Sequence, residues 1–285
     1  MRAVVWVNGQ ISDAASAAIP VFDHGFLYGE GVYETLRTYD QRPAFFERHM
    51  QRLRRSAGMM ALAVPYDDAG FLARVHETTT ALDAPGERYI RILLTRGVGD
   101  LTYDPAACPT PSLVIIVKPF AEPPVRSFTE GIAVALVGVR RNHPAALNPR
   151  IKSNNLLNNA LAMQEALRQG AEEALMLNQA GHVTECSQAN FFVVLGDTLV
   201  TAPLEAGLLP GITREYVLEL AARLGVPAAE RDYAPAELAS ATEAFVTSTT
   251  REVMAVTRID DRIVGDGRPG PITNQLLEAY RAGVN

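Results

Sequence analysis

The chain has 285 residues, of which 48% are hydrophobic and 20% are charged, a balance typical of globular proteins and too apolar for a disordered chain. Its net charge of −6, with no basic run interleaved with aromatic residues, argues against nucleic acid as a partner. No apolar run is long enough to cross a membrane, and the first residues lack the apolar core and cleavage site of a signal peptide, so we expect no membrane association.

The two cysteines, Cys108 and Cys186, stand far apart and outside any CxxC or Cys/His spacing. Such a pair favours a reducing compartment over a disulfide scaffold. The five histidines show no metal-ligand spacing either. We therefore expect a cytoplasmic protein without a metal site.

The first 118 residues predict a small α/β domain of short strands and two amphipathic helices. The Asn8-Gly9 pair predicts a hairpin turn. Alternating residues predict a strand over 32–39, and short apolar segments between turns predict further strands at 4–7, 10–12, the stretch around 19–22, 44–46, 89–95 and 113–117. The expected helices are 47–58, with Met50, Leu53 and Ala57 on one side, and a helix that begins at Asp67 or Asp68 and carries Phe71, Leu72 and Val75 inward.

A proline-rich stretch marks the expected boundary between two domains. Residues 118–126 hold three prolines and no periodic pattern, which is typical of a linker. We place a small domain at 1–118, the linker at 119–127 and a large domain at 128–285. Elements expected in the large domain are strands 132–139, 173–177, 182–186, 190–195, 243–247 and 253–259, and helices through 157–166, over 212–224 with Tyr216, Leu220 and Leu224 on one face, and from 272 onward. Helices and strands that mix without strict alternation predict an α+β fold.

Lysine is almost absent from the chain, which draws attention to Lys152. The 26 basic residues comprise 24 arginines and two lysines, Lys118 and Lys152. Arginine stays charged, whereas a lysine amine that loses its proton can attack a carbonyl group. Lys152 is therefore a candidate for Schiff-base chemistry. A solvated surface lysine is the ordinary alternative.

Three further features of the large domain could serve a ligand. Glu185 lies on a short predicted strand, where its carboxylate could keep a pyridine nitrogen protonated; an edge-strand glutamate is the alternative. A Pro-Gly pair precedes the helix over 212–224, so the amides of Ile212 and Thr213 could bind an anion, or simply start a helix. The hydroxyl-rich run 247–250 could hold a phosphate or cap a turn.

The order of these motifs resembles the class IV aminotransferases, the pyridoxal-phosphate enzymes of fold type IV. The likeness extends over nearly the whole chain and rests on the stretches 22–34, 49–53, 147–153, 183–185, 209–214 and 248–250. A single short motif is a weak signal, but this many motifs in the same order are specific to one family. The resemblance implies a two-domain α+β protein of the D-amino-acid aminotransferase-like fold that binds pyridoxal 5'-phosphate. It also implies a homodimer with its active site near the domain and subunit boundaries.

The resemblance implies roles for individual residues. Lys152 would bind the cofactor covalently and move a proton on the substrate. The other cofactor contacts implied are Glu185 at the pyridine nitrogen, Leu209 behind the ring, and Arg52, Ile212, Thr213 and Thr249 at the phosphate. The substrate contacts implied are Tyr28, Tyr33, Tyr89, Arg91 and Thr250.

Features of two subfamilies are mixed in the sequence. Tyr89 and Arg91, two residues apart on a strand and therefore on one face, are similar to the branched-chain aminotransferases, as is the run 141–149. Tyr33 and the run 248–250 are more similar to the D-amino-acid aminotransferases.

We expect a transaminase that moves the amino group of a branched-chain L-amino acid to 2-oxoglutarate. The arginine and histidine that D-amino-acid aminotransferases carry after a Thr-Arg-Gly motif are missing, since 98–117 contains no basic residue. Leu156 stands where many branched-chain members carry a tyrosine. D-amino-acid or (R)-amine transamination and the aminodeoxychorismate lyase reaction are the enzymatic alternatives. A carrier or regulatory protein that binds the cofactor without turnover is the non-enzymatic one.

Overall fold

The computed structural model describes residues 2–284, which form two compact units. The first unit contains the chain up to Ala121 together with Ile151–Asn155, and the second contains Glu122–Arg150 and the chain from Leu156 onward. The change of unit after Ala121 falls within the stretch expected as a linker. The five residues Ile151–Asn155, expected within 128–285, group instead with the first unit.

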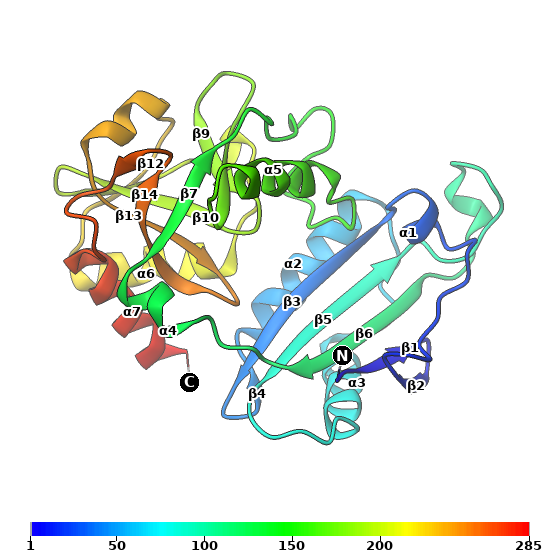
Figure 1. The fold of residues 1–285 in the computed structure, drawn as a ribbon. Helices are drawn as coiled ribbons and strands as arrows, with labels where there is room; N and C mark the ends of the chain where they lie inside the picture. Colours follow the sequence, from blue (N-terminus) through cyan, green and yellow to red (C-terminus); the bar gives the residue numbers. More distant parts are fainter. Residues whose placement is uncertain (1, 285) are drawn as a thin grey trace. The chain divides into compact units, whose positions relative to one another are not determined.

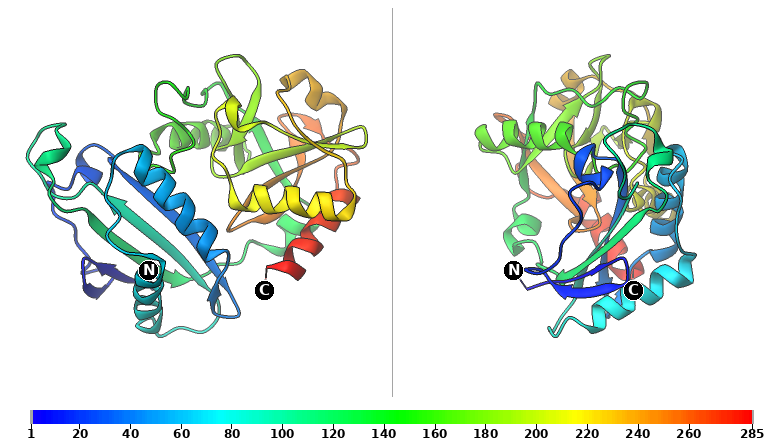
Figure 2. Two further views of the ribbon diagram at one scale, coloured as in Figure 1. Left: turned by 180° about the vertical axis from the view of Figure 1, so that it is seen from behind. Right: turned by 90° about the vertical axis from the view of Figure 1, so that its right-hand side faces the viewer.

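The first unit is an antiparallel sheet with strand order β2-β1-β6-β5-β3-β4. Its strands are β1 (Val4–Val7), β2 (Gln10–Asp13), β3 (Gly31–Tyr39), β4 (Arg42–Pro43), β5 (Arg88–Thr95) and β6 (Ser112–Pro119). Its helices are α1 (His24–Leu27), α2 (Phe46–Met59) and α3 (Asp68–Thr80), with a 3-10 turn at Pro105–Ala107. Helix α2 packs on β3 and α3 packs on β1 and β6, so both cover the same face of the sheet (Figures 1 and 2).

Alternation along β3 and β5 separates the core of this unit from the face that carries the candidate residues. Leu36, Ile90 and Leu94 are fully buried beneath the helices. Tyr33 and Arg91 occupy the alternate positions and lie on the opposite face, where their side chains contact each other. The pleat of two strands therefore decides which residues are available to a ligand.

Three sequence predictions for this unit are wrong in detail. The stretch around 19–22 forms no strand and is exposed. The return strand expected over 44–46 is β4 at Arg42–Pro43 instead, because Phe46 already begins α2 and packs its ring into the core. Leu72 of α3 is exposed, since it lies one position round the helix from Phe71, which fills the core. The other predicted strands and both helices of this unit are confirmed to within about two residues.

The second unit is built on a mixed nine-stranded sheet with the path β12-β11-β10-β13-β14-β7-β8-β9 and β15 beside β14. Its strands are β7 (Ile132–Leu136), β8 (Glu173–Leu177), β9 (Val183–Cys186), β10 (Asn190–Leu195), β11 (Thr198–Thr201), β12 (Ala228–Glu230), β13 (Ala241–Ser248), β14 (Glu252–Ile259) and β15 (Arg262–Ile263). Its helices are α4 (Val125–Thr129), α5 (Leu157–Arg168), α6 (Ile212–Leu224) and α7 (Pro271–Gly283), with 3-10 turns at Leu204–Ala206 and Pro235–Ser240.

The sheet of the second unit closes on itself at one residue pair. Asn190 of β10 pairs with Glu185 of β9, so the path from β10 through β13, β14, β7 and β8 returns to β10. Strand β8 is buried along its whole length within this ring. The closure brings β9, which carries a candidate carboxylate, against β10.

Most predictions for the second unit are confirmed, and the differences have local causes. The bounds of α6 are those predicted, although Leu224 at its end is exposed. Strand β7 ends at Leu136 and not at 139, because Gly138 N donates its hydrogen bond to Glu165 of α5 over 2.7 Å. Strands β11 and β12 were not predicted. Within residues 2–284, no helix is long and apolar enough to span a membrane, and no cluster of three His, Cys, Asp or Glu side chains is placed to hold a metal.

Candidate active site

Lys152 lies in the five-residue segment that joins the first unit. Tyr33 N donates to Lys152 O and Asn154 N donates to Gly31 O, each over 2.9 Å, so the segment extends the sheet beside β3. Lys152 N also donates to the buried Ser56 hydroxyl of α2 over 3.2 Å. A Cβ on Gly31 would lie 2.5 Å from Asn154 Nδ2, so glycine keeps the two segments close. The lysine is fixed at its backbone while its side chain stays half-buried.

Two cations contact the ring of Tyr33 on the sheet face opposite the helices. Arg91 Cζ lies 4.1 Å and Lys152 Nζ lies 4.5 Å from the ring centroid. Both distances are typical of cation–π contacts. The two positive groups come from β5 and from the segment beside β3, and together they make this part of the face attractive to an anion.

The other predicted substrate residues of this unit lie further from Tyr33. Tyr89 shares the sheet face of Arg91, and its ring contacts Lys118 Nζ at 4.8 Å from the centroid. Tyr28 follows α1, and its ring centroid lies 5.0 Å from that of Tyr103. The structure thus brings Arg91 and Lys152 together at one tyrosine, and places Tyr28 and Tyr89 beside other partners.

Arg52 belongs to a buried ion-pair cluster that the sequence analysis missed. Glu34 of β3 is fully buried, and Arg52 Nε and Nη2 donate to its two oxygens, each over 2.7 Å. His49 Nδ1 donates to the same carboxylate over 2.7 Å. Burial alone would raise the pKa of Glu34, but the Arg52 charge and the hydrogen bonds hold that pKa well below its usual range. The three-residue spacing of His49 and Arg52 in a predicted helix places them on one face, but it gives no sign that Glu34 is their partner.

The protonation of His49 follows from its surroundings. Burial lowers its pKa below 6.5, and the nearby charges of Arg52 and Lys152 lower it further, against the opposite effect of Glu34. The ring is therefore neutral at pH 7. An ionised carboxylate can only accept, so the single ring proton is on Nδ1.

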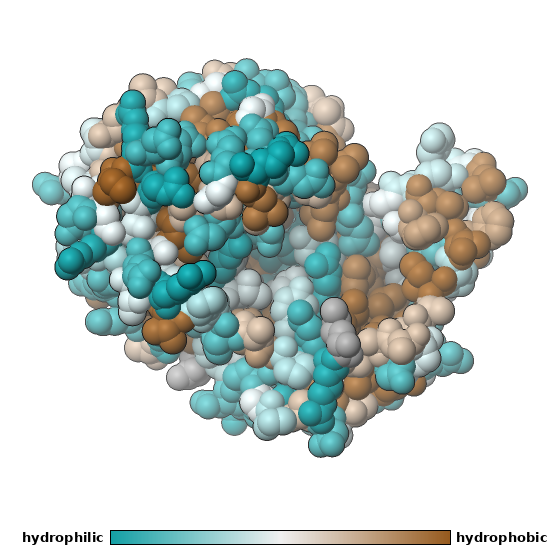
Figure 3. Space-filling model, in the orientation of Figure 1, coloured by the Kyte–Doolittle hydropathy of each residue, from teal (hydrophilic) through white to brown (hydrophobic). Residues whose placement is uncertain are grey.

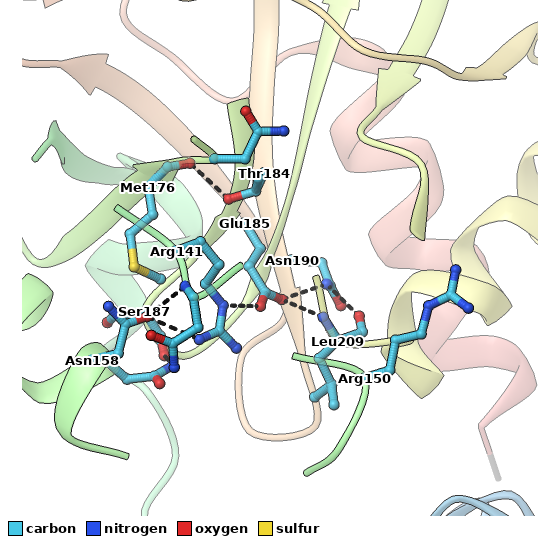
Figure 4. A network of polar contacts seen from close by, with 12 residues as sticks. Arg141, Arg150, Asn158, Met176, Thr184, Glu185, Ser187, Asn190 and Leu209 are labelled. Atoms are coloured by element: carbon cyan, nitrogen blue, oxygen red, sulfur yellow. Dashed lines mark hydrogen bonds and ion pairs between the residues drawn. The ribbon is translucent and has the colours of Figure 1, made fainter. Parts of the chain in front are cut away.

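In the second unit, Glu185 accepts three hydrogen bonds (Figure 4). Arg141 Nε donates to Oε1 over 2.8 Å, and Asn190 Nδ2 and Leu209 N donate to Oε2 over 3.0 and 3.1 Å. Arg141 Nη1 in turn donates to Asn158 Oδ1 over 3.1 Å. A donor set of this kind favours the ionised carboxylate. Arg141 lies in a run that the sequence analysis singled out, but its contact with Glu185 was not predicted.

The loop that begins α6 is attached to the same carboxylate. Asn190 Nδ2 also donates to Leu209 O over 2.9 Å. Gly211 is the N-cap of α6 and provides no side-chain cap, and Ile212 and Thr213 form the buried first turn. A Cβ on Gly211 would lie 1.9 Å from Asn190 Oδ1, which only glycine avoids. A helix start of this kind is an ordinary anion-binding feature.

The hydroxyl-rich run 247–250 ends β13 and continues into the following turn, and its hydroxyls differ in their contacts. Ser248 Oγ accepts from Arg251 N over 3.2 Å and so caps the turn in which Thr249 and Thr250 lie half-buried. Thr247, which pairs with Asn190 across two strands, is buried, and its hydroxyl has no hydrogen-bond partner among the described residues. Buried hydroxyls are rarely left without a partner, so this group is suited to a ligand.

The predicted site residues fall into two sets, one in each unit. Those in the first unit are Tyr28, Tyr33, Arg52, Tyr89, Arg91 and Lys152, and those in the second are Glu185, Leu209, Ile212, Thr213, Thr249 and Thr250. Within the second set, hydrogen bonds join Glu185 and Leu209, whereas Thr249 and Thr250 belong to a separate turn. Leu156 precedes α5 as its N-cap residue.

A family model described as amino-transferase class IV matches residues 31–259 of the chain. The chain belongs to the class IV aminotransferases. This aminotransferase is 36% identical over 277 residues to a Methanocaldococcus jannaschii protein provisionally named as a branched-chain-amino-acid aminotransferase, which covers 97% of this chain and 95% of that protein. It is 34% identical over 279 residues to the D-alanine aminotransferase of Listeria monocytogenes, which covers 97% of this chain and 94% of that enzyme.

A solved structure gives the same result for the fold. The branched-chain aminotransferase of Thermoproteus uzoniensis, crystallised with norvaline, matches 98% of this aminotransferase and 93% of that chain with a TM-score of 0.90 and 35% identity. The expected α+β fold of type IV is confirmed, and the chain is an enzyme. The names of the relatives divide between branched-chain and D-alanine aminotransferases, as the sequence motifs do.

Proposed function

We propose that this class IV aminotransferase uses pyridoxal 5'-phosphate to move the amino group of a branched-chain L-amino acid to 2-oxoglutarate. The observation that carries the proposal is the contact of Lys152 and Arg91 with one ring, that of Tyr33. It sets an amine suited to bind a carbonyl carbon beside a cation suited to a second carboxylate. The names of the relatives from M. jannaschii and T. uzoniensis support the branched-chain assignment.

The side chains present suit the cofactor in charge and in donor type. Class IV aminotransferases depend on pyridoxal 5'-phosphate, which supplies an electron sink for negative charge at the substrate Cα. Lys152 offers the amine, and Glu185 offers an ionised carboxylate for the ring nitrogen. The start of α6 and the unpartnered hydroxyl of Thr247 offer donors for a phosphate. We assign Arg52 to the phosphate as well, in an orientation fixed by Glu34.

Each residue then has a defined task. Lys152 Nζ would hold the cofactor and, once released from it, would take the proton from the substrate Cα and return one during transfer. Glu185, whose carboxylate accepts from Arg141 and Asn190, would keep a proton on the ring nitrogen. Arg91 orients 2-oxoglutarate through its second carboxylate.

Arg91 has to tolerate two different substrates. 2-Oxoglutarate brings a carboxylate toward this cation, whereas a branched-chain amino acid brings only methyl groups. Leaving a guanidinium without an anion in a site that excludes water costs free energy, unless another group interacts with its charge. The Tyr33 ring at 4.1 Å supplies that interaction, so Arg91 can accept an apolar side chain at a lower cost.

D-Amino-acid transamination is the second candidate, favoured by the 34% identity to the L. monocytogenes D-alanine aminotransferase. The decisive experiment measures transfer to 2-oxoglutarate from L-leucine, D-alanine and an (R)-amine in parallel, with pyruvate release from aminodeoxychorismate as a fourth reaction. We expect the highest kcat/KM with L-leucine. A protein inert toward L-leucine but active in one of the other reactions would replace the branched-chain assignment.

We also infer that two copies of the chain associate through an apolar surface of the first unit. Val21, Phe22 and Phe26 lie exposed beside Leu101 and Tyr103, with Phe26 at 66% and Tyr103 at 85% exposure. Backbone pairing joins the two loops that carry these side chains, so they form one surface. Apolar groups of this kind gather at the right of Figure 3. A patch of several large apolar side chains usually marks an interface, and a second copy is the occupant we assign.

A further inference from the structure

We propose that Asn190 is a positioning residue that makes the binding of the two ends of the cofactor, ring and phosphate, mutually dependent. The inference rests on the proposed use of pyridoxal 5'-phosphate. Its basis is a closed set of three hydrogen bonds among Asn190, Glu185 and Leu209 (Figure 4).

The side-chain amide of Asn190 donates in two directions. Nδ2 lies 3.0 Å from Glu185 Oε2 and 2.9 Å from Leu209 O, and Leu209 N returns to the same Oε2 over 3.1 Å. The carboxylate assigned to the ring nitrogen and the loop that opens α6 are therefore parts of one network. Neither can shift without stretching a hydrogen bond of the other.

The other end of the Asn190 amide is fixed by packing. Its Oδ1 occupies the space that a Cβ on Gly211 would need, since the two would lie 1.9 Å apart. Gly211 is the N-cap of α6, so the amide touches the residue from which the helix starts. Asn190 itself is 5% exposed and lies on β10 between Glu185 of β9 and Thr247 of β13. Asn190 therefore contacts both the Glu185 carboxylate, through a hydrogen bond, and Gly211, through close packing.

This arrangement has a thermodynamic consequence. A ring bound at Glu185 restricts the carboxylate, and through Asn190 it also restricts the loop and the helix start. A phosphate that binds afterwards loses less conformational entropy in ordering the loop and the helix start, so its affinity rises. Linkage requires that phosphate raise the affinity for the ring by the same factor.

The test separates the two ends of the cofactor into two probes, pyridoxal and inorganic phosphate. Cofactor is removed from the full-length protein, and the phosphate Kd is measured by calorimetry with and without saturating pyridoxal. We expect saturating pyridoxal to tighten phosphate binding by about fivefold or more in the wild type. In Asn190→Ala this factor should fall to about 1, the value for independent sites. Asn274→Ala, which removes an exposed asparagine of α7 that bonds to Pro269 O, should keep the wild-type factor.

A second variant reaches the same network without removing any donor. Gly211→Ala introduces a Cβ that must displace Asn190 Oδ1, and its φ of −76° suits alanine, so no backbone strain is added. We expect Gly211→Ala to abolish the coupling as Asn190→Ala does. When Asn190→Ala is already present, the next neighbour of that Cβ is Arg214 Cβ at 3.4 Å, an ordinary contact. Adding Gly211→Ala to Asn190→Ala should therefore lower the pyridoxal affinity by less than it does in the wild type.

The outcomes separate this inference from the proposed function. A wild-type protein that binds both probes with at least fivefold coupling, lost in both variants, supports the role of Asn190. Undiminished coupling in a folded Asn190→Ala or Gly211→Ala overturns it and leaves the transaminase assignment intact. A wild-type protein that binds neither pyridoxal nor pyridoxal 5'-phosphate overturns both, and this result is recognised before any variant is made.

Discussion

Lys152 and Arg91 contact the same tyrosine ring, yet they are suited to different chemistry. An ammonium group can lose its proton and attack a carbonyl carbon, whereas a guanidinium remains charged and pairs with anions. The chain uses arginine at 24 of its 26 basic positions, so the lysine beside Tyr33 is the candidate for an amine that can be deprotonated. Two predictions at the scale of single residues follow from this difference.

The first prediction is that borohydride fixes the cofactor on Lys152. After reduction and digestion, peptide mapping should find the pyridoxyl label on the peptide that contains Lys152. Lys152→Ala should bind the cofactor but complete no multiple turnover, because the covalent link and the proton carrier are both lost. Lys118, the other lysine, serves as the internal control. A label on Lys118, or none, would contradict the assignment.

The second prediction separates the two half-reactions. Arg91→Leu should weaken 2-oxoglutarate by roughly 2 to 4 kcal/mol, the cost of losing one partner of a desolvated charge pair. The half-reaction with L-leucine, followed by cofactor absorbance in single turnover, should change far less. Lys118→Leu is the matched control, since Lys118 lies on the same sheet face but contacts Tyr89. Equal losses in both half-reactions would show that Arg91 supports the shared α-carboxylate site or the fold.

At the scale of elements, Glu34 joins β3 to α2. Its carboxylate accepts from Arg52 and His49, and no side chain of this trio is more than 4% exposed. The lowered pKa of Glu34 means that its contribution to stability is complete above its ordinary value of 4.5 and is lost as the pH falls toward the folded value. The lowered pKa of His49 means that the unfolded chain binds more protons below about pH 6.5. Acid therefore destabilises the cluster through both groups, and His49 responds first.

The third prediction tests this order. The wild-type free energy of unfolding should fall between pH 7 and pH 5, a window that lies above the ordinary pKa of Glu34 and includes that of His49. In His49→Gln the fall should be smaller, because glutamine can donate to Glu34 and does not titrate. Urea unfolding at both pH values measures the difference. His182→Gln, at a partly exposed histidine of the second unit, should retain the wild-type pH dependence; a fall that is unchanged in His49→Gln would rule out His49 as its source.

At the scale of the whole molecule, the apolar surface formed by Phe22, Phe26 and Tyr103 predicts association of two copies. Phe26→Asp places a charge on that surface and should shift the sedimentation mass from dimer to monomer at micromolar concentration, because burying an unpaired charge is costly. Val125→Asp changes an exposed valine of the second unit and should leave the mass unchanged. A monomeric wild type, or a dimer unaffected by Phe26→Asp, would remove this surface as the interface.

The sequence by itself predicted most of the elements and marked single residues as candidates for chemistry. Alternation predicted β3, short apolar runs predicted β5 and β6, and helical spacing predicted α2 and α6, because these patterns depend on neighbours within one element. The rarity of lysine identified Lys152, and the Pro-Gly pair identified the start of α6. Each of these signals depends only on residues close together in the sequence, so it can be recognised without the tertiary structure.

The tertiary structure decided which residues act together. Nothing local indicates that Arg52 would bond to Glu34, 18 residues away, or that Arg141 would bond to Glu185, 44 residues away. The double donation of Asn190 also depends on the closure of β9 onto β10 and on the path of the loop before α6. The sequence fixes which groups are available, but strand pairing between distant segments fixes their neighbours. A side chain's partner, protonation and freedom to bind a ligand follow from those neighbours and not from its place in the chain.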